Sequence, residues 1–140
     1  MFDQITLLLS FVFAIALTHL LLSASELMLE RERVIFSPML TLWMLNALIG
    51  LVVNWLSIWE LSIIKHWRVG DVLLQFIPAV VQYFTCSLVS MKAGQEREID
   101  MPAFWRRQRP LIGAAFATSF ILAMIQNYVY QRHHAGFRRR

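Results

Sequence analysis

Long apolar runs separated by short charged segments dominate the chain. Each run has about 20 residues, the length that a helix needs to cross the hydrocarbon core of a bilayer. None contains Lys, Arg, Asp or Glu, and none alternates with the period of two that barrel strands require. Backbone groups in lipid must also pair within their own segment, which favours helices. We therefore predict an all-α fold, a transmembrane four-helix bundle, with spans at about 5–24, 39–58, 72–91 and 111–130.

The segments between the runs carry signals for helix ends. Residues 25–38 are dense in charge and lack Gly, so we expect the first helix to continue about two turns beyond the membrane. Ser37 and Pro38 suit the N-cap and first position of the second helix. The other predicted boundaries are a stop at Gly70, a cap at Asp71, a stop at Gly94 and a start at Pro110. No repeat or linker interrupts the pattern, so residues 1–140 form a single transmembrane domain.

Aromatic residues cluster near the predicted span ends. Trp and Tyr rings suit the head-group region, so we interpret residues such as Trp43, Trp105 and Tyr130 as parts of interfacial belts. Phe104 and Trp105, followed by three arginines up to Arg109, have the pattern of an interfacial anchor.

Composition supports the membrane interpretation. The hydrophobic fraction of the 140 residues is 58%, against 45–50% in ordinary soluble proteins, and a soluble domain of this size could not bury it. Thirteen basic and nine acidic residues give a formal net charge of +4. The basic residues stand in short blocks beside the spans, where they meet lipid head groups, and not in the continuous patch of a nucleic-acid-binding protein. The lone Cys86 excludes an internal disulfide.

Charge also bears on orientation. Seven basic residues lie on the side of the first and third connections and six on the other side. The first span has no basic residue before it and has Arg31 and Arg33 after it. We therefore hypothesise that these two connections are cytoplasmic and that both termini are outside. The uncharged-to-acidic start and the length of the first run are unlike a signal peptide, so we expect this span to be retained.

Two stretches resemble a family of bacterial multi-helix integral membrane proteins. Residues 16–46, ALTHLLLSASELMLERERVIFSPMLTLWMLN, are similar to its small-residue/His/Leu-Leu motif, charged turn and Trp-bearing second helix. Residues 104–116, FWRRQRPLIGAAF, are similar to the aromatic and Arg-rich start of its last helix. The resemblance covers about a third of the chain. It implies a multi-helix membrane fold and points to no known activity. We expect the protein to be a multi-pass protein of a bacterial inner membrane.

Polar residues inside a span are candidates for function, or they bond neighbouring helices. His19, Ser23, Glu26 and Glu30 are spaced by four, three and four residues, which places them on one helical face. This stripe descends from the membrane surface into lipid. It could relay protons or hold a cation, or it could be the bundle-facing side of an overhanging helix.

A second set lies on the third span, where Gln75, Pro78, Gln82 and either Thr85 or Cys86 recur at helical spacing. Pro78 predicts a kink, and the carbonyl that it frees near Leu74 needs a partner. A Gln amide from another helix could supply it.

A third set lies on the second span, where Asn46, Gly50 and Asn54 are four residues apart. This spacing predicts a narrow face that another helix can approach closely, as do the small residues after Gly113 on the fourth span, which also carries Gln126 and Asn127. Together the sets suggest a polar trail across the bundle. Its candidate ligand or proton-path residues are His19, Ser23, Glu26, Asn46 and Gln82.

Several functions are disfavoured. Only His19 lies within a span, whereas His66 is in the second connection and His133 and His134 are in the tail, so a bis-histidine haem lacks its second ligand. The spans hold no Lys for retinal, and no phosphate-binding or nucleophile motif is present. We expect no catalytic residues, metal site, cofactor or nucleic-acid partner.

We therefore predict that the protein is a non-enzymatic structural, accessory or interaction subunit. Its expected partners are the lipid bilayer and either further copies or a larger membrane complex. The alternative is an oligomeric small channel or carrier that uses the His19 face and the Pro78 kink. A membrane enzyme stays open as a third and weaker possibility.

Overall fold

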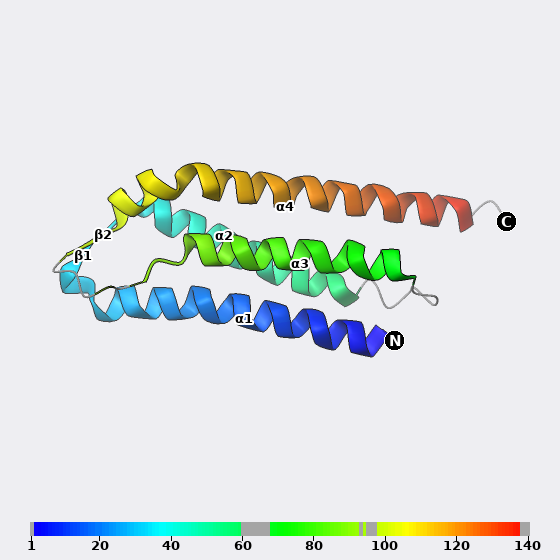
Figure 1. Ribbon diagram of the computed structural model, residues 1–140, viewed down its shortest axis with the longest axis horizontal. Helices are drawn as coiled ribbons and strands as arrows, with labels where there is room; N and C mark the ends of the chain where they lie inside the picture. Colours follow the sequence, from blue (N-terminus) through cyan, green and yellow to red (C-terminus); the bar gives the residue numbers. More distant parts are fainter. Residues whose placement is uncertain (1, 60–67, 93, 95–97, 138–140) are drawn as a thin grey trace.

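Four helices make up nearly all of the chain that is described. The computed structural model describes residues 2–59, 68–92, 94 and 98–137, with side chains as far as Arg132. The helices are α1 (Phe2–Leu29), α2 (Pro38–Ser57), α3 (Val69–Val89) and α4 (Met101–Phe137). All four are long and apolar enough to cross a membrane, so the predicted all-α four-helix arrangement is confirmed. Successive helices run antiparallel, and the start of α1 and the end of α4 lie at the same end of the bundle (Figure 1).

α3 lies at the centre of the packing. It contacts all three other helices, whereas α1 and α4 have little contact with each other. Small side chains, among them Ala16, Ala47, Ala79 and Cys86, are almost fully buried along these contacts. Small residues let helix backbones approach closely, which is how helices pack where lipid provides no hydrophobic driving force between them.

The outer faces of the bundle are apolar. In the most apolar stretch of α4 only 6% of the residues are buried inside the protein, and in α2 only 17%. The exposed side chains there are large hydrophobic ones, such as Leu42, Ile49, Phe120 and Ile121. Water would not tolerate so much contiguous apolar surface, but lipid does. The outer faces of α2 and α4 are therefore suited to contact with lipid and not with water.

A pair of two-residue strands joins the two connections at the other end of the bundle. β1 (Val34–Ile35) pairs in parallel with β2 (Ile99–Asp100), and Val34 faces Ile99 in register. The first and third connections therefore lie on one side of the bundle, as predicted. The strand pair itself was not predicted, because two residues are too short to show a period.

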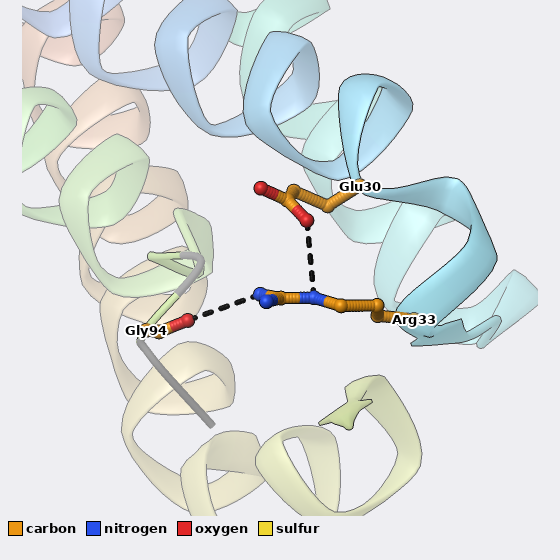
Figure 2. Close-up of polar contacts among 3 residues, drawn as sticks. All are labelled: Glu30, Arg33 and Gly94. Carbon is orange, nitrogen blue, oxygen red and sulfur yellow. Dashed lines mark hydrogen bonds and ion pairs between the residues drawn. The ribbon is translucent and has the colours of Figure 1, made fainter. Parts of the chain in front are cut away.

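Polar contacts at this end support the strand pairing. η1, a 3₁₀ turn over Arg31–Arg33, follows α1 and continues it as expected. Arg33 forms an ion pair between Nε and Glu30 Oε2 at 3.0 Å, and its Nη2 donates to the carbonyl of Gly94 at 3.2 Å (Figure 2). One side chain thus links the end of α1 to the segment before α4.

The predicted helix ends are partly right. Ser37 caps α2 by accepting a hydrogen bond at Oγ from the amide of Leu40 at 3.4 Å. The stop at Gly70 is wrong, since α2 ends at Ser57 and Gly70 lies in the first turn of α3. Asp71 does help to cap α3, but from inside the helix, where its Oδ2 accepts from the amide of Arg68 at 3.0 Å. The predicted end of α3 at Gly94 is also wrong, because the helix ends at Val89. The described glycines have no positive φ, the conformation of a glycine stop.

The predicted start of α4 at Pro110 is wrong as well. The helix begins at Met101, where Asp100 Oδ1 accepts from the amide of Ala103 at 2.8 Å. Pro110 lies inside the helix and leaves the carbonyl of Arg106 without its usual donor. Arg106 is exposed beside the connections, where water can solvate that carbonyl.

The predicted interfacial anchor forms the first turns of α4, and its Trp packs inside the bundle. The rings of Trp105 and Trp43 are stacked, with centroids 5.8 Å apart. Trp43 also meets Phe116 edge to face at 4.6 Å. These two Trp residues therefore join α2 to α4, and the interpretation of them as head-group belts was incomplete.

Candidate functional site

Gln82 and Ser23 are the most deeply buried of the predicted site residues, and Gln82 lies in the second half of α3. Its side chain is 4% exposed. Its Nε2 donates to the carbonyl of Ala47 at 3.1 Å, and its Oε1 accepts from Asn54 Nδ2 at 3.2 Å. Both partners belong to α2. The carboxamide therefore uses its donor and its acceptor to hold α2 against α3.

Asn46 is not part of this contact, although it shares a helix with Asn54. Residues four apart turn by about 40° around a helix with 3.6 residues per turn, so Asn46 and Asn54 differ by about 80°. Gly50 and Asn54 face Gln82, whereas Asn46 is exposed on the outer face of α2. Within the described part of the chain Asn46 makes no hydrogen bond. The structure thus divides the predicted face of the second span in two.

His19 and Ser23 both face α3, as the predicted stripe requires. His19 Nε2 lies 3.3 Å from the hydroxyl of Tyr83, and the two rings meet edge to face. Ser23 is buried and donates from Oγ to the carbonyl of Met91 at 2.6 Å. That carbonyl follows the end of α3, where backbone acceptors have no partner in the helix. Glu26 is half-buried one turn further towards the connections.

A chain of carboxamides joins α3 to α4 at the end near the termini. Gln126 Nε2 donates to the carbonyl of Leu74 at 3.1 Å and to Gln75 Oε1 at 3.1 Å. Gln75 in turn donates to the hydroxyl of Tyr130. Leu74 is four residues before Pro78, so its carbonyl is the one that Pro78 frees. The expected partner, a Gln amide from another helix, is present.

α3 runs without interruption through Pro78, from Val69 to Val89. On its side facing α4, Thr85 Oγ1 lies 3.4 Å from Ser119 Oγ, and each hydroxyl also donates to a carbonyl of its own helix. Cys86, fully buried, receives a weak contact from Gln82 at 3.8 Å.

These contacts place the predicted residues at separate points. Tyr83 contacts α1 and Gln82 contacts α2, about 100° apart around α3. Gln75 and Gln82 are seven residues apart, or about 10 Å along the axis. Among the described residues no three His, Cys, Asp or Glu side chains are grouped so that they could hold a metal ion. His66 lies outside the described residues, as do the side chains of His133 and His134. The arrangement can hold helices together: His19 with Tyr83 joins α1 to α3, Gln82 joins α2 to α3, and Gln126 joins α4 to α3.

Sequence reasoning missed Tyr83 and Ser119 and assigned Tyr130 to a belt. Tyr83 lies on the same span as Gln82 but on another face, and a single Tyr within a span carries no periodic signal. Pro78 was the signal that could have indicated Tyr130. The carbonyl that Pro78 frees requires polar groups opposite it on a neighbouring helix, and Tyr130 belongs to the polar group that meets it.

Comparison with protein families, curated proteins and solved structures finds no match for this chain. The resemblance to a bacterial membrane family therefore stays an expectation.

Proposed function

We propose that this protein is a non-enzymatic subunit, located in a bacterial inner membrane, that acts by contact with other membrane helices. The observation that carries the proposal is Asn46. This residue lies near the middle of α2, is exposed on the outer face of the bundle, and has no hydrogen bond within the described residues. A carboxamide in hydrocarbon is costly until it finds a partner, so its position favours a helix from outside this chain.

Other exposed polar groups in the spans do not need such a partner. Thr18 and Thr118 are also exposed, but each hydroxyl donates to a carbonyl four residues earlier in its own helix, at 2.8 Å. Asn127 is exposed too, but it lies near the end of the apolar run of α4, where head groups and water can reach it. Asn46 differs from these residues because it is both deep and without a partner in its own helix.

The residues around Asn46 form a repeating surface, which we call the α2 seam. Its members are exposed and are spaced by three and four residues in turn: Met39, Leu42, Asn46, Ile49, Val53 and Leu56. This is the heptad spacing of a left-handed helix pair. A single Asn in such a seam sets register and favours pairing with an identical helix, because a carboxamide both donates and accepts. A second copy of this chain is therefore the proposed partner.

The experiment measures association of the full chain in lipid vesicles by energy transfer between donor- and acceptor-labelled copies. Asn46→Leu should weaken association by about 3- to 30-fold, since an interhelical hydrogen bond in a membrane contributes about 0.6–2 kcal/mol. Asn127→Leu is the matched control and should leave association unchanged. A further check uses Leu42→Cys in a Cys86→Ala background, which should form a disulfide-linked dimer. Monomers in vesicles, or a dimer indifferent to Asn46→Leu, would overturn the α2 seam as the contact.

The alternative is an oligomeric channel or carrier that uses the His19 face and Pro78. The contact between His19 and Tyr83, which joins α1 to α3 inside a span, favours it. Against it, Ser23 and Gln82 already donate to backbone carbonyls. Flux measurements in proteoliposomes test it, with His19→Ala and Gln82→Ala as the variants. Flux that either substitution abolishes would favour this alternative over the interaction subunit.

A further inference from the structure

A groove lies between α1 and α2 on the side of the bundle near the connections. Its volume is about 500 Å³ and its lining is almost wholly apolar. α1 contributes Leu20 and Ala24, η1 contributes Arg31, and α2 contributes Met44 and Leu48. The groove exists because α1 and α2 contact each other less than either contacts α3. In a bilayer this space is open to lipid.

The groove runs from the hydrocarbon to the head-group region. On the α1 side its lining begins at Leu20 and ends at Arg31 in η1, eleven residues further on, which is about 16 Å at 1.5 Å per residue. This lining is apolar from Leu20 to Met28 and becomes charged only at Arg31. The same order of groups, a hydrocarbon chain with a polar head group at one end, is found in a lipid.

The head-group end of the groove carries one positive charge. Arg31 is the one charged residue in the described lining, and it is exposed with no ion pair among the described residues. Arg33, two residues on, is occupied by Glu30 and by the carbonyl of Gly94. A free guanidinium above an apolar slot complements a molecule with a phosphate at one end and a hydrocarbon chain at the other.

We propose that this groove is a binding site for an anionic phospholipid of the leaflet beside the connections. One acyl chain lies between α1 and α2, and the phosphate lies against Arg31. The site is separate from the α2 seam, so it does not depend on the proposed dimer.

The test uses the purified full chain in nanodiscs or micelles and counts bound lipids by native mass spectrometry. Phosphatidylglycerol and phosphatidylcholine with the same acyl chains compete for the protein. We expect retention of phosphatidylglycerol over phosphatidylcholine by about fivefold, the factor expected for one Lys or Arg at an anionic surface. Arg31→Gln should remove this preference. Arg107→Gln, an exposed arginine on α4 outside the groove, is the matched control and should retain it.

A second variant tests the apolar part. Ala24→Phe places a ring in the groove and should reduce retention of both lipids, while the thermal transition of the protein shows whether it is still folded. Equal retention of the two lipids by the unmodified chain would overturn the proposal. An equal effect of Arg107→Gln and Arg31→Gln would also overturn it. A disulfide-linked dimer of Met28→Cys in a Cys86→Ala background would show that a second copy fills the groove instead.

Discussion

Gln82 and Asn46 carry the same functional group at similar depth in the bundle, yet they have opposite surroundings. Gln82 is 4% exposed and binds Ala47 and Asn54 on α2. Asn46 is on α2 itself, one residue before Ala47, and faces outward. On α2 itself, about 80° around the helix separates Asn54, whose carboxamide closes the bundle by bonding Gln82, from Asn46, whose carboxamide remains open to another molecule. A polar residue in a span therefore has to be judged by its face and not by its depth alone.

The strongest test of the inner member of this pair is Gln82→Ala. It removes two hydrogen bonds, leaves Asn54 without its acceptor and opens a cavity at the α2–α3 contact. We expect the free energy of unfolding to fall by about 2–3 kcal/mol. SDS titration of the protein in mixed micelles, followed by circular dichroism, measures the change. Gln131→Ala, exposed near the end of the last apolar run, is the control and should be neutral; a neutral Gln82→Ala would contradict the role assigned here.

A second test asks whether hydrogen bonds elsewhere in the bundle act in the same way as those of Gln82. Gln126→Ala removes the donor to Leu74 and should cost about 1–2 kcal/mol of unfolding free energy. In a Pro78→Ala background, Leu74 regains an amide partner in its own helix, so Gln126→Ala should cost about 0.5–1 kcal/mol less. Pro78→Ala alone should still insert. A double-mutant cycle in mixed micelles measures the coupling free energy between Gln126→Ala and Pro78→Ala. Strictly additive effects of the two substitutions would contradict the bond between Gln126 and the Leu74 carbonyl.

Asn46→Leu tests the outer member of the pair. Because Asn46 makes no bond inside the described chain, the free energy of unfolding of the detergent monomer should change by no more than about 0.5 kcal/mol. The same variant should weaken association in vesicles, as proposed above. Comparison of the two measurements separates the two faces of α2. A loss of monomer stability as large as that of Gln82→Ala would mean that Asn46 supports the fold.

The smallest effect is expected at Gly50, which lies opposite Gln82. A methyl group built there would come 3.4 Å from Gln82 Nε2, an ordinary contact distance. Gly50→Ala should therefore be close to neutral, because higher helix propensity offsets slight crowding. Gly50→Leu should instead displace Gln82 and destabilise the protein. Thermal stability in detergent distinguishes the two, and a strongly destabilised Gly50→Ala would show that α2 and α3 pack more tightly than described.

The four spans were predictable because length and the absence of charge are strong signals. The N-cap at Ser37 and the partner of the Leu74 carbonyl were also predictable, since both depend on local backbone chemistry. The starts of α3 and α4 were not. The side-chain cap at Asp100 fixes the start of α4 at Met101, nine residues before Pro110, and the helix continues through that proline.

The candidate site was predictable in kind but not in arrangement. His19, Ser23 and Gln82 do face α3 or α2, because helical periodicity fixes which residues share a face. Asn46 and Asn54 face different ways because each step of four residues turns by about 40° around the helix. Contacts such as His19 with Tyr83 depend on the rotation of two helices far apart in sequence, which no single span encodes.

The pairing of β1 with β2 has a consequence for the order of events during synthesis. Ile99 leaves the ribosome 65 residues after Val34, so at 5–20 residues per second the strand partner follows by about 3–13 s. The bonds from Ser23 to Met91 and from Arg33 to Gly94 wait as long. The hairpin of α1 and α2 therefore enters the membrane first, with its turn unpaired. A nascent chain arrested within α3 would present that open turn to chaperones and proteases, and completion of the third connection would remove it from their reach.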